Sequence, residues 1–237
     1  MTNIILRNLV VFLAVIGLSL TSVNANTPNV IVITNPSTNK SFKFVDVAVD
    51  NLNLLKEKLD KLGMSEHLFT LQGIMLVETR AGVGGSIGLP KADWTRRSYG
   101  LMQITVPTAR VFLQRYPDVA QKYIGNTPVN KTSNEKIIKL LLHNKEANIH
   151  LGALVFKVYL DMVDGEWARA VAAYNMGIGN ALRRPYAPKV KYVKDVREMM
   201  GFAKGLNEHL TKSVVPATVI TPFVSDVVSD DDNDDNN

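Results

Sequence analysis

The segment KEANIHLGALVFKVYLDMV, residues 145–163, constrains the fold more than any other part of the sequence. Read at the helical period, it is apolar on almost every side. Its most polar face consists of His150, Leu154, Lys157 and Asp161. A helix with so little polar surface is stable in water only when other elements surround it. The segment therefore predicts a central helix in a helical core.

Other segments also carry the helical period. Leu52, Leu55, Leu59 and Leu62 line one face, and Gly63 follows them as a stop signal. The further helices that the pattern predicts lie at about 65–79, 107–115, 134–144, 166–175 and 189–204. No internal repeat is visible. The sequence therefore predicts one mainly α-helical domain over residues 47–210.

Capping residues mark two of these helix starts. Thr105 is expected to cap the helix at 107–115, which has a proline in its first turn. Thr132 and Glu135 have the spacing of a capping box ahead of the helix at 134–144.

The first 25 residues have a composition of their own. Arg7 precedes an apolar stretch at 9–20, and small residues follow at Val23 and Ala25. This order is typical of a secretory signal peptide, here cut after Ala25. The apolar stretch is too short to span a bilayer comfortably, so we predict export with no stable membrane anchor after cleavage. The alternative is an uncleaved membrane anchor.

Two flanking regions lack the helical pattern. Residues 26–46 hold VIVIT and SFKFV on either side of the turn-forming NPSTNK, which predicts an irregular or β-like N-terminal arm. Residues 211–237 are rich in valine, threonine and proline, and their last twelve positions contain six aspartates. This composition predicts an extended or disordered acidic tail.

The net charge of +5 is unevenly distributed along the chain. Without Arg7 and the six aspartates of the tail, residues 26–225 carry a net charge of +10. A basic body suits an anionic partner such as an acidic wall polymer or a membrane surface, and predicted export argues against nucleic acid. The alternative is a solvated basic surface with no partner. The chain has no cysteine, which excludes a lipoprotein anchor and thiolate metal sites.

Glu78 is the first candidate for chemistry. Leu71, Ile74, Met75 and Glu78 fall at positions i, i+3, i+4 and i+7, so the carboxyl lies on an apolar stripe. It also lies at the end of its helix, where the dipole disfavours negative charge. Both effects raise the pKa of a carboxyl, as a general acid requires. The alternative is a glutamate that turns outward to pair with one of the arginines after it.

The segment SYGLMQIT, residues 98–105, places Gln103 between Met102 and Ile104. A buried amide costs about 1–3 kcal/mol unless its donors and acceptor find partners. The glutamine is therefore either bonded to the backbone or directed at a ligand.

The segment AVAAYNMGIGN, residues 170–180, ends a predicted helix with Tyr174 and Asn175. Its alanines allow a neighbouring element to approach closely, and its glycines indicate a turn near another element or a ligand. It is not a dinucleotide-binding loop, because it follows a helix and has no G-x-G-x-x-G register.

The histidines do not predict a metal site. His143 and His150 lie two helical turns apart, about 10 Å by helix rise, which is too far to share one ion. His67 and His209 have no partner at a telling spacing. The sequence therefore predicts neither a metal ion nor a cofactor.

Taken together, five features resemble the soluble lytic transglycosylases. They are Glu78 at the end of an apolar helix, GLMQIT at 100–105, NIHLGA at 148–153, AVAAYNMGIGN at 170–180 and YVKDV at 192–196. The resemblance covers about residues 65–200. It implies a lysozyme-like helical fold and an enzyme that cuts the glycan strand of peptidoglycan.

The resemblance also implies roles for individual residues. Glu78 is expected to act as the single catalytic acid and then as the base. The residues expected to bind substrate are Gln103 with Met102 packed beneath it, Tyr174 beside Glu78, Asn175 in the following turn, and Tyr192. Gln103 is expected to line the sugar groove and reserve its amide for substrate. The alternative for both tyrosines is core packing.

The chain departs from the family pattern at several positions. Thr79 follows the glutamate where serine is usual, and Trp94 stands where a groove serine is usual, with Ser98 as its candidate replacement. The start of the longer segment after Glu78 looks more like the goose-type lysozymes. Asp93 lies near the position of an aspartate in those enzymes, whereas Thr105 stands where they carry a carboxylate.

The predicted function is an exported peptidoglycan lytic transglycosylase of the periplasm or cell envelope. It is expected to cleave the bond between N-acetylmuramic acid and N-acetylglucosamine and to form 1,6-anhydromuramic acid. Its expected partner is the peptidoglycan glycan strand. The alternatives are a hydrolase like the goose-type lysozymes and a non-catalytic peptidoglycan-binding scaffold.

Overall fold

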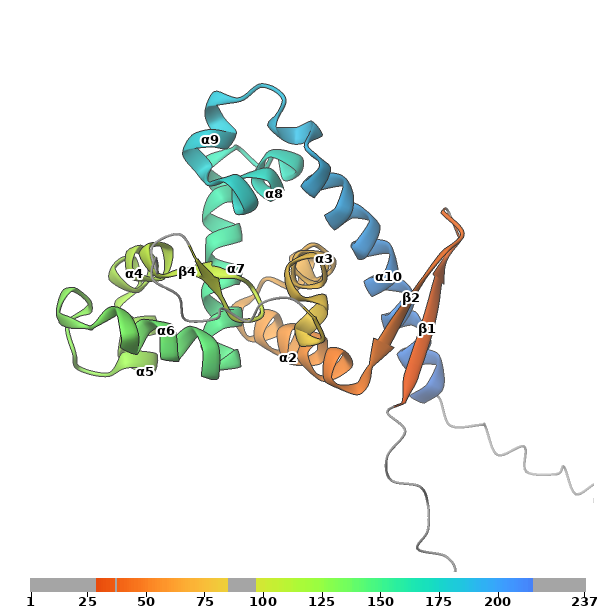
Figure 1. The fold of residues 1–237 in the computed structure, drawn as a ribbon, viewed down its shortest axis with the longest axis horizontal. Helices are drawn as coiled ribbons and strands as arrows, with labels where there is room; N and C mark the ends of the chain where they lie inside the picture. The colour runs from red at the N-terminus through yellow and green to blue at the C-terminus, as the bar shows by residue number, and fades with distance from the viewer. Residues whose placement is uncertain (1–28, 37, 85–96, 215–237) are drawn as a thin grey trace, which may run out of the picture.

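The computed structural model describes residues 29–36, 38–84 and 97–214 (Figure 1). The predicted signal peptide, Asp93, Trp94 and most of the predicted tail lie outside these ranges. Within them, none of the helices combines the length and the hydropathy needed to cross a membrane.

The described part of the chain is mostly helical. The α-helices are α2 Asp46–Leu62, α3 Leu68–Thr79, α4 Val106–Arg115, α5 Pro117–Ile124, α6 Asn134–His143, α7 Lys145–Met162, α8 Trp167–Met176, α9 Ile178–Arg183 and α10 Lys191–Val214. Short 3-10 turns are η1 Ser65–His67, η2 Arg80–Gly82, η4 Val129–Lys131 and η5 Ala187–Lys189. Two antiparallel strand pairs complete it: β1 Val30–Asn35 with β2 Lys40–Val45, and β3 Ser98–Tyr99 with β4 Ile104–Thr105. The predicted mainly α fold and the N-terminal hairpin are confirmed.

Helix α7 occupies the centre of the fold, as its sequence predicts. Eleven consecutive or near-consecutive side chains between Ala147 and Val158 are buried. Figure 1 shows α4, α5 and α6 on one side of α7, and α3 and α10 on the other. The helix therefore separates a small lobe from the lobe that carries Glu78.

Helices α3 and α10 pack at close range along their length (Figure 1). A Cβ atom added to Gly73 of α3 would lie 2.8 Å from the carbonyl oxygen of Val196 on α10. The hairpin β1–β2 lies against the second half of α10, where Gly205 makes room for Ile33. This packing brings the start of α10 to the end of α3.

Several predicted helix boundaries need correction. Thr105 does cap α4, because its Oγ1 accepts a hydrogen bond from the N–H of Thr108 at 3.2 Å. The cap of α6 is Ser133 and not Thr132, whose hydroxyl donates to the carbonyl of Pro128 instead. Helices α5 and α9 were not predicted. Helix α10 also continues to Val214, four residues into the segment predicted as tail.

Candidate active site

Glu78 lies in the last turn of α3, where the chain leaves the helix through Arg80 in the left-handed region (φ 51°). Its side chain is partly buried beside the apolar face of the helix, as predicted. The hydroxyl of Tyr192, at the start of α10, donates a hydrogen bond of 2.5 Å to Oε1 of Glu78. The carboxyl thus turns toward α10, in agreement with the inward orientation and not with the outward alternative.

Burial raises the pKa of Glu78 above its ordinary value, while the hydrogen bond from Tyr192 lowers it by a smaller amount. Burial and the nearby Glu78 charge raise the pKa values of Tyr192 and Tyr174 well above their ordinary value. Both phenols therefore stay protonated and act as hydrogen-bond donors. The Glu78 carboxyl therefore resists ionisation and has a neutral hydrogen-bond donor beside it. A general acid needs a carboxyl that stays protonated in this way.

The tight turn between β3 and β4, residues 99–103, lies against the end of α3, where Thr79 contacts it. Asn148 of α7 holds it with both ends of its buried amide. Its Nδ2 donates to the carbonyl of Tyr99 at 2.8 Å, and its Oδ1 accepts from the N–H of Met102 at 2.7 Å. A polar residue at the centre of the largely buried helix α7 therefore has a structural role.

Two further side chains hold the 99–103 turn. Thr79 donates from Oγ1 to the carbonyl of Leu101 at 3.0 Å. Tyr174 of α8 donates from its hydroxyl to the carbonyl of Met102 at 2.9 Å. Together with Asn148 and Gln103, they satisfy four successive carbonyls of the turn with four different side chains. Thr79, where the family usually has serine, still supplies the hydroxyl.

Gly100 is the residue around which the 99–103 turn closes. Its φ is 75°, and an added Cβ would collide with the backbone carbonyl of Leu141 and the amide of Asn148. Gln103 also has a positive φ, 48°, which a non-glycine residue adopts only when its surroundings hold it there. The turn is therefore fixed by packing as well as by hydrogen bonds.

The side-chain amide of Gln103 is bonded to the backbone, one of the two options that its sequence position allows. Its Nε2 donates to the carbonyl of Gly100 at 2.8 Å, and its Oε1 accepts from the hydroxyl of Ser98 at 3.2 Å. The amide is therefore bonded within its own turn. Met102 is fully buried. A substrate-binding role for Gln103, Met102 and Ser98 remains a prediction.

The two tyrosines make different contacts. Tyr174, which was expected beside Glu78, is close enough for the Glu78 charge to raise its pKa, and its hydroxyl donates to the carbonyl of Met102 in the 99–103 turn. Tyr192 is the residue that contacts the carboxyl of Glu78. Asn175 was expected to hold the following turn, but it is exposed. Asn180 closes that turn instead, with a 2.7 Å hydrogen bond from Nδ2 to the carbonyl of Met176.

The histidines have other contacts in the structure. Within the residues that the structure describes, no group of three or more His, Asp or Glu side chains is placed to hold an ion. His150 instead contacts Tyr123, 3.1 Å between Nδ1 and the hydroxyl. Burial, with Lys58 and Lys122 nearby, lowers its pKa to about 4.

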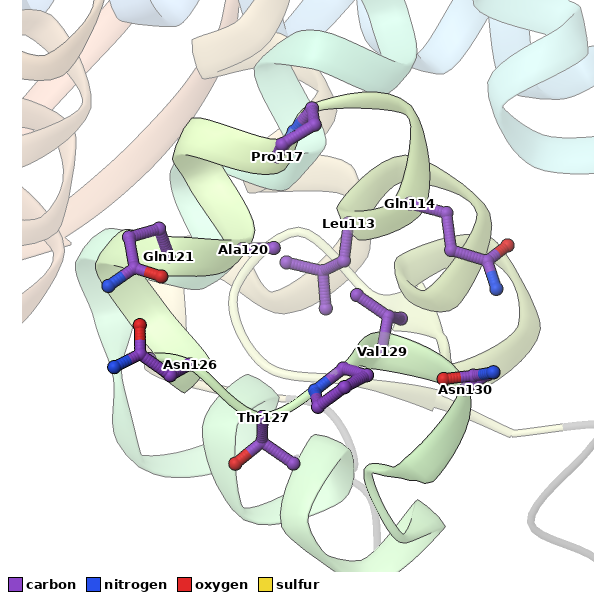
Figure 2. Close-up of a pocket in the computed structure, with 11 residues that line it drawn as sticks. Leu113, Gln114, Pro117, Ala120, Gln121, Asn126, Thr127, Val129 and Asn130 are labelled. Carbon is purple, nitrogen blue, oxygen red and sulfur yellow. The ribbon is translucent and has the colours of Figure 1, made fainter.

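A cavity of about 460 Å³ lies elsewhere, in the small lobe between α4, α5 and η4 (Figure 2). Its floor is apolar, with Leu113, Ala120 and Val129, and amide side chains including Gln121 and Asn126 stand around it. None of the predicted site residues lines this cavity. It is therefore separate from the candidate active site.

Comparison with known protein families identifies a domain within the chain. The transglycosylase SLT domain matches residues 84–192. A comparison with curated proteins gives no significant match. The matched range includes the 99–103 turn, α7, α8 and Tyr192, and it begins six residues after Glu78.

The fold and the family together define the class of the protein. The described structure is a mostly helical domain, and the chain contains a transglycosylase SLT domain, the domain of the peptidoglycan lytic transglycosylases. These enzymes are lyases that act on glycosidic bonds. The resemblance seen in the sequence is therefore confirmed, and the domain supports transglycosylase activity on peptidoglycan.

Proposed function

We propose that the protein is an exported lytic transglycosylase that leaves 1,6-anhydromuramic acid at the cut end of the glycan strand. The observation that carries the proposal is the environment of Glu78. Its carboxyl is partly buried, its pKa is raised, and its hydrogen bond comes from the neutral hydroxyl of Tyr192. Such a group holds its proton more tightly than an exposed carboxyl does and can donate it to a bound substrate.

The chemistry needs only this one carboxyl. Glu78 protonates the glycosidic oxygen between N-acetylmuramic acid and N-acetylglucosamine, and the bond from C1 to that oxygen breaks. The acetamido oxygen of the muramic acid stabilises the electron-poor C1. The Glu78 carboxylate then takes the proton from the C6 hydroxyl of the same sugar, and O6 bonds to C1. No water is consumed, and Glu78 ends in its starting protonation state.

Hydrolysis by two carboxylates is the second candidate. Burial and Tyr192 account for the pKa shift of Glu78, and no other carboxylate of the described residues contributes to it. Thr105, at the position where the goose-type lysozymes carry a carboxylate, uses its hydroxyl to cap α4. Asp93 lies outside the described residues and is tested by experiment.

The proposal includes cleavage of the signal peptide after Ala25 and a site of action in the periplasm or cell envelope. Its support is the order of charge, apolar stretch and small residues at the N-terminus. The N-terminal mass of the mature protein tests it. A mature chain that retains residues 1–25 would contradict this part of the proposal.

The mass of the products tests the reaction. Purified peptidoglycan is digested with the wild type, Glu78→Gln and Asp93→Asn, and the fragments are weighed. We expect anhydro fragments, one water lighter than hydrolytic fragments, from the wild type and Asp93→Asn, and a loss of at least about 100-fold with Glu78→Gln. Reducing-end muramic acid that disappears in Asp93→Asn would indicate a lysozyme. No cleavage by the wild type would indicate a binding scaffold.

A further inference from the structure

An apolar groove of about 320 Å³ lies between α4, α7 and α9. Val111 and Met162 line it and expose 58% and 49% of their surfaces, although large apolar side chains are usually buried. Phe112, Tyr159 and Ile178 complete most of its apolar lining. Exposed apolar side chains that gather in one hollow mark a binding surface more often than scattered ones do.

Helices α4 and α7, which line this groove, both contact β4, the strand that follows the 99–103 turn. Helix α4 starts next to Thr105, at the end of the strand that leaves the 99–103 turn. Helix α9 starts at Ile178, four residues after Tyr174. Tyr159, in the groove, lies close enough to Tyr174 to influence its pKa. The groove therefore lies on the side of the candidate active site that β4 and Tyr174 form.

Arg115 is the charged residue of the groove lining. It is exposed, and its guanidinium lies over the ring of Tyr116, 5.9 Å from the ring centre. Among the described residues it enters no ion pair, so its charge is available to an anionic ligand. The groove therefore combines an apolar surface with one available cation.

Peptidoglycan has a component with the complementary chemistry. Each muramic acid can carry a short peptide on its lactyl group, with small aliphatic side chains and free carboxylates. The sugars themselves are rich in hydroxyl groups and have less aliphatic surface for an apolar groove to contact. We infer that this groove binds the stem peptide of the muramic acid next to the cleaved bond, with Arg115 on a peptide carboxylate. The inference rests on the proposed function, because it assumes a peptidoglycan substrate at Glu78.

The test compares two substrates that differ only in the peptide. Glycan strands with intact stem peptides are digested beside the same strands after an amidase has removed the peptides. The readout is the ratio of kcat/KM on peptide-bearing strands to kcat/KM on bare strands. For the wild type we expect a ratio of about ten, which corresponds to about 1.4 kcal/mol of extra binding in the transition state.

The variants are Arg115→Gln and the double variant Val111→Gln with Met162→Gln. Each is expected to lower the ratio toward one, whereas Arg115→Lys keeps most of it because the charge remains. Val32→Gln is the matched control, because Val32 is 53% exposed on β1, away from the groove, and its ratio is expected to match the wild type. A wild-type ratio of one, or variants that slow both substrates equally, would overturn the inference.

A binding experiment separates this inference from the proposed function. Glu78→Gln protein is titrated by calorimetry with a disaccharide that carries a tetrapeptide and with the bare disaccharide. We expect the peptide to tighten binding about tenfold, and Arg115→Gln to remove the gain. If no strand is cleaved at all, the proposed function fails while this difference still supports the groove as a peptide site. Equal binding of the two ligands would leave the groove to a partner protein and would refute the inference.

Discussion

The 99–103 turn and Glu78, in the last turn of α3, are held in opposite ways, although Thr79, the residue after Glu78, contacts the 99–103 turn. Four side chains satisfy four successive carbonyls of the turn, and Asn148 also accepts from the N–H of Met102. Glu78 has its hydrogen bond from Tyr192 in a largely apolar setting. The 99–103 turn thus receives many hydrogen bonds, whereas the Glu78 carboxyl receives few. A small number of donors suits a general acid, because each further donor would lower its pKa.

The largest expected effect is the loss of stability in Gly100→Ala, which tests how firmly the 99–103 turn is held. The new Cβ would strike the carbonyl of Leu141 at a positive φ, so we expect a loss of about 4 kcal/mol in the free energy of unfolding. Gly63→Ala is the matched control, because Gly63 has a φ of 63° with open space around it. It should lose only about 1 kcal/mol. Denaturant unfolding of both variants measures the difference, and equal losses would show that the 99–103 turn is not tightly packed.

The next largest effect is expected for Asn148→Ala. The change leaves the carbonyl of Tyr99 and the N–H of Met102 buried without partners, which costs about 3 kcal/mol. Asn148→Asp keeps the acceptor but buries a carboxyl against the carbonyl of Tyr99, so its loss near neutral pH should be at least as large. Asn175→Ala, on the exposed surface, should change stability by less than about 0.5 kcal/mol. A small loss in Asn148→Ala would mean that water replaces the amide.

Substitution of the two tyrosines tests directly whether Tyr174 holds the 99–103 turn and Tyr192 contacts Glu78. Tyr174→Phe removes the donor to the carbonyl of Met102 in the 99–103 turn and should cost about 1–2 kcal/mol of stability. Tyr192→Phe removes the donor to Glu78 and should cost less, because the carboxyl can take up a proton and become neutral. Thermal unfolding near neutral pH compares them. A larger loss in Tyr192→Phe would reverse the assignment.

Tyr192→Phe should also move the pH profile of the activity. The hydrogen bond from Tyr192 lowers the pKa of Glu78, so its removal raises that pKa. Activity that needs protonated Glu78 is present below its pKa and is lost as pH rises through it. The alkaline limb of kcat/KM should therefore shift to higher pH in Tyr192→Phe, while Tyr159→Phe should leave it nearly in place. A shift to lower pH would contradict a role for Glu78 as general acid.

The smallest expected effect is a gain of stability in Glu78→Gln. The pKa of Glu78 is higher in the folded chain than in the unfolded chain, so the folded chain binds the proton more tightly. Its stabilising contribution is full below the unfolded pKa and is lost as pH rises through the folded pKa. Glu78→Gln should therefore be more stable than the wild type near neutral pH and equal to it at acidic pH. Denaturant midpoints at both pH values measure this, and a variant that is less stable at neutral pH would refute it.

The sequence predicts the long helices well because their periodicity repeats over several turns. Helix α7 spans Lys145–Met162 against a predicted 145–163, and Gly63 ends α2 as its position indicates. Helices α5 and α9 are only eight and six residues long, so they offer too few turns for a period to show. The proline at the start of α5 was a usable signal. The cap of α6 was misplaced by one residue because Thr132 and Ser133 are both capping residues.

The site was predictable in its members but not in its contacts. The apolar stripe was enough to bring Glu78 inward. Which tyrosine reaches it depends on how α8 and α10 pack, because the partners lie 114 residues apart for Tyr192 and 72 residues apart for Tyr174 and Met102. Asn148 was missed as a turn-holding residue, although an asparagine in an otherwise apolar helix was a signal for it. Its use follows only once the 99–103 turn lies against α7.

The hydrogen bonds that hold the 99–103 turn also have a consequence for the order of folding. Its partners come from α3, α7 and α8, at sequence separations of 22, 49 and 72 residues. The turn closes only when those helices have docked, so we expect its hydrogen bonds to form after the main folding barrier. Substitutions that weaken it should leave the folding rate nearly unchanged and speed unfolding. We therefore expect the 99–103 turn to form last during folding. The strength of its hydrogen bonds would then set the unfolding rate and with it the lifetime of the native molecule.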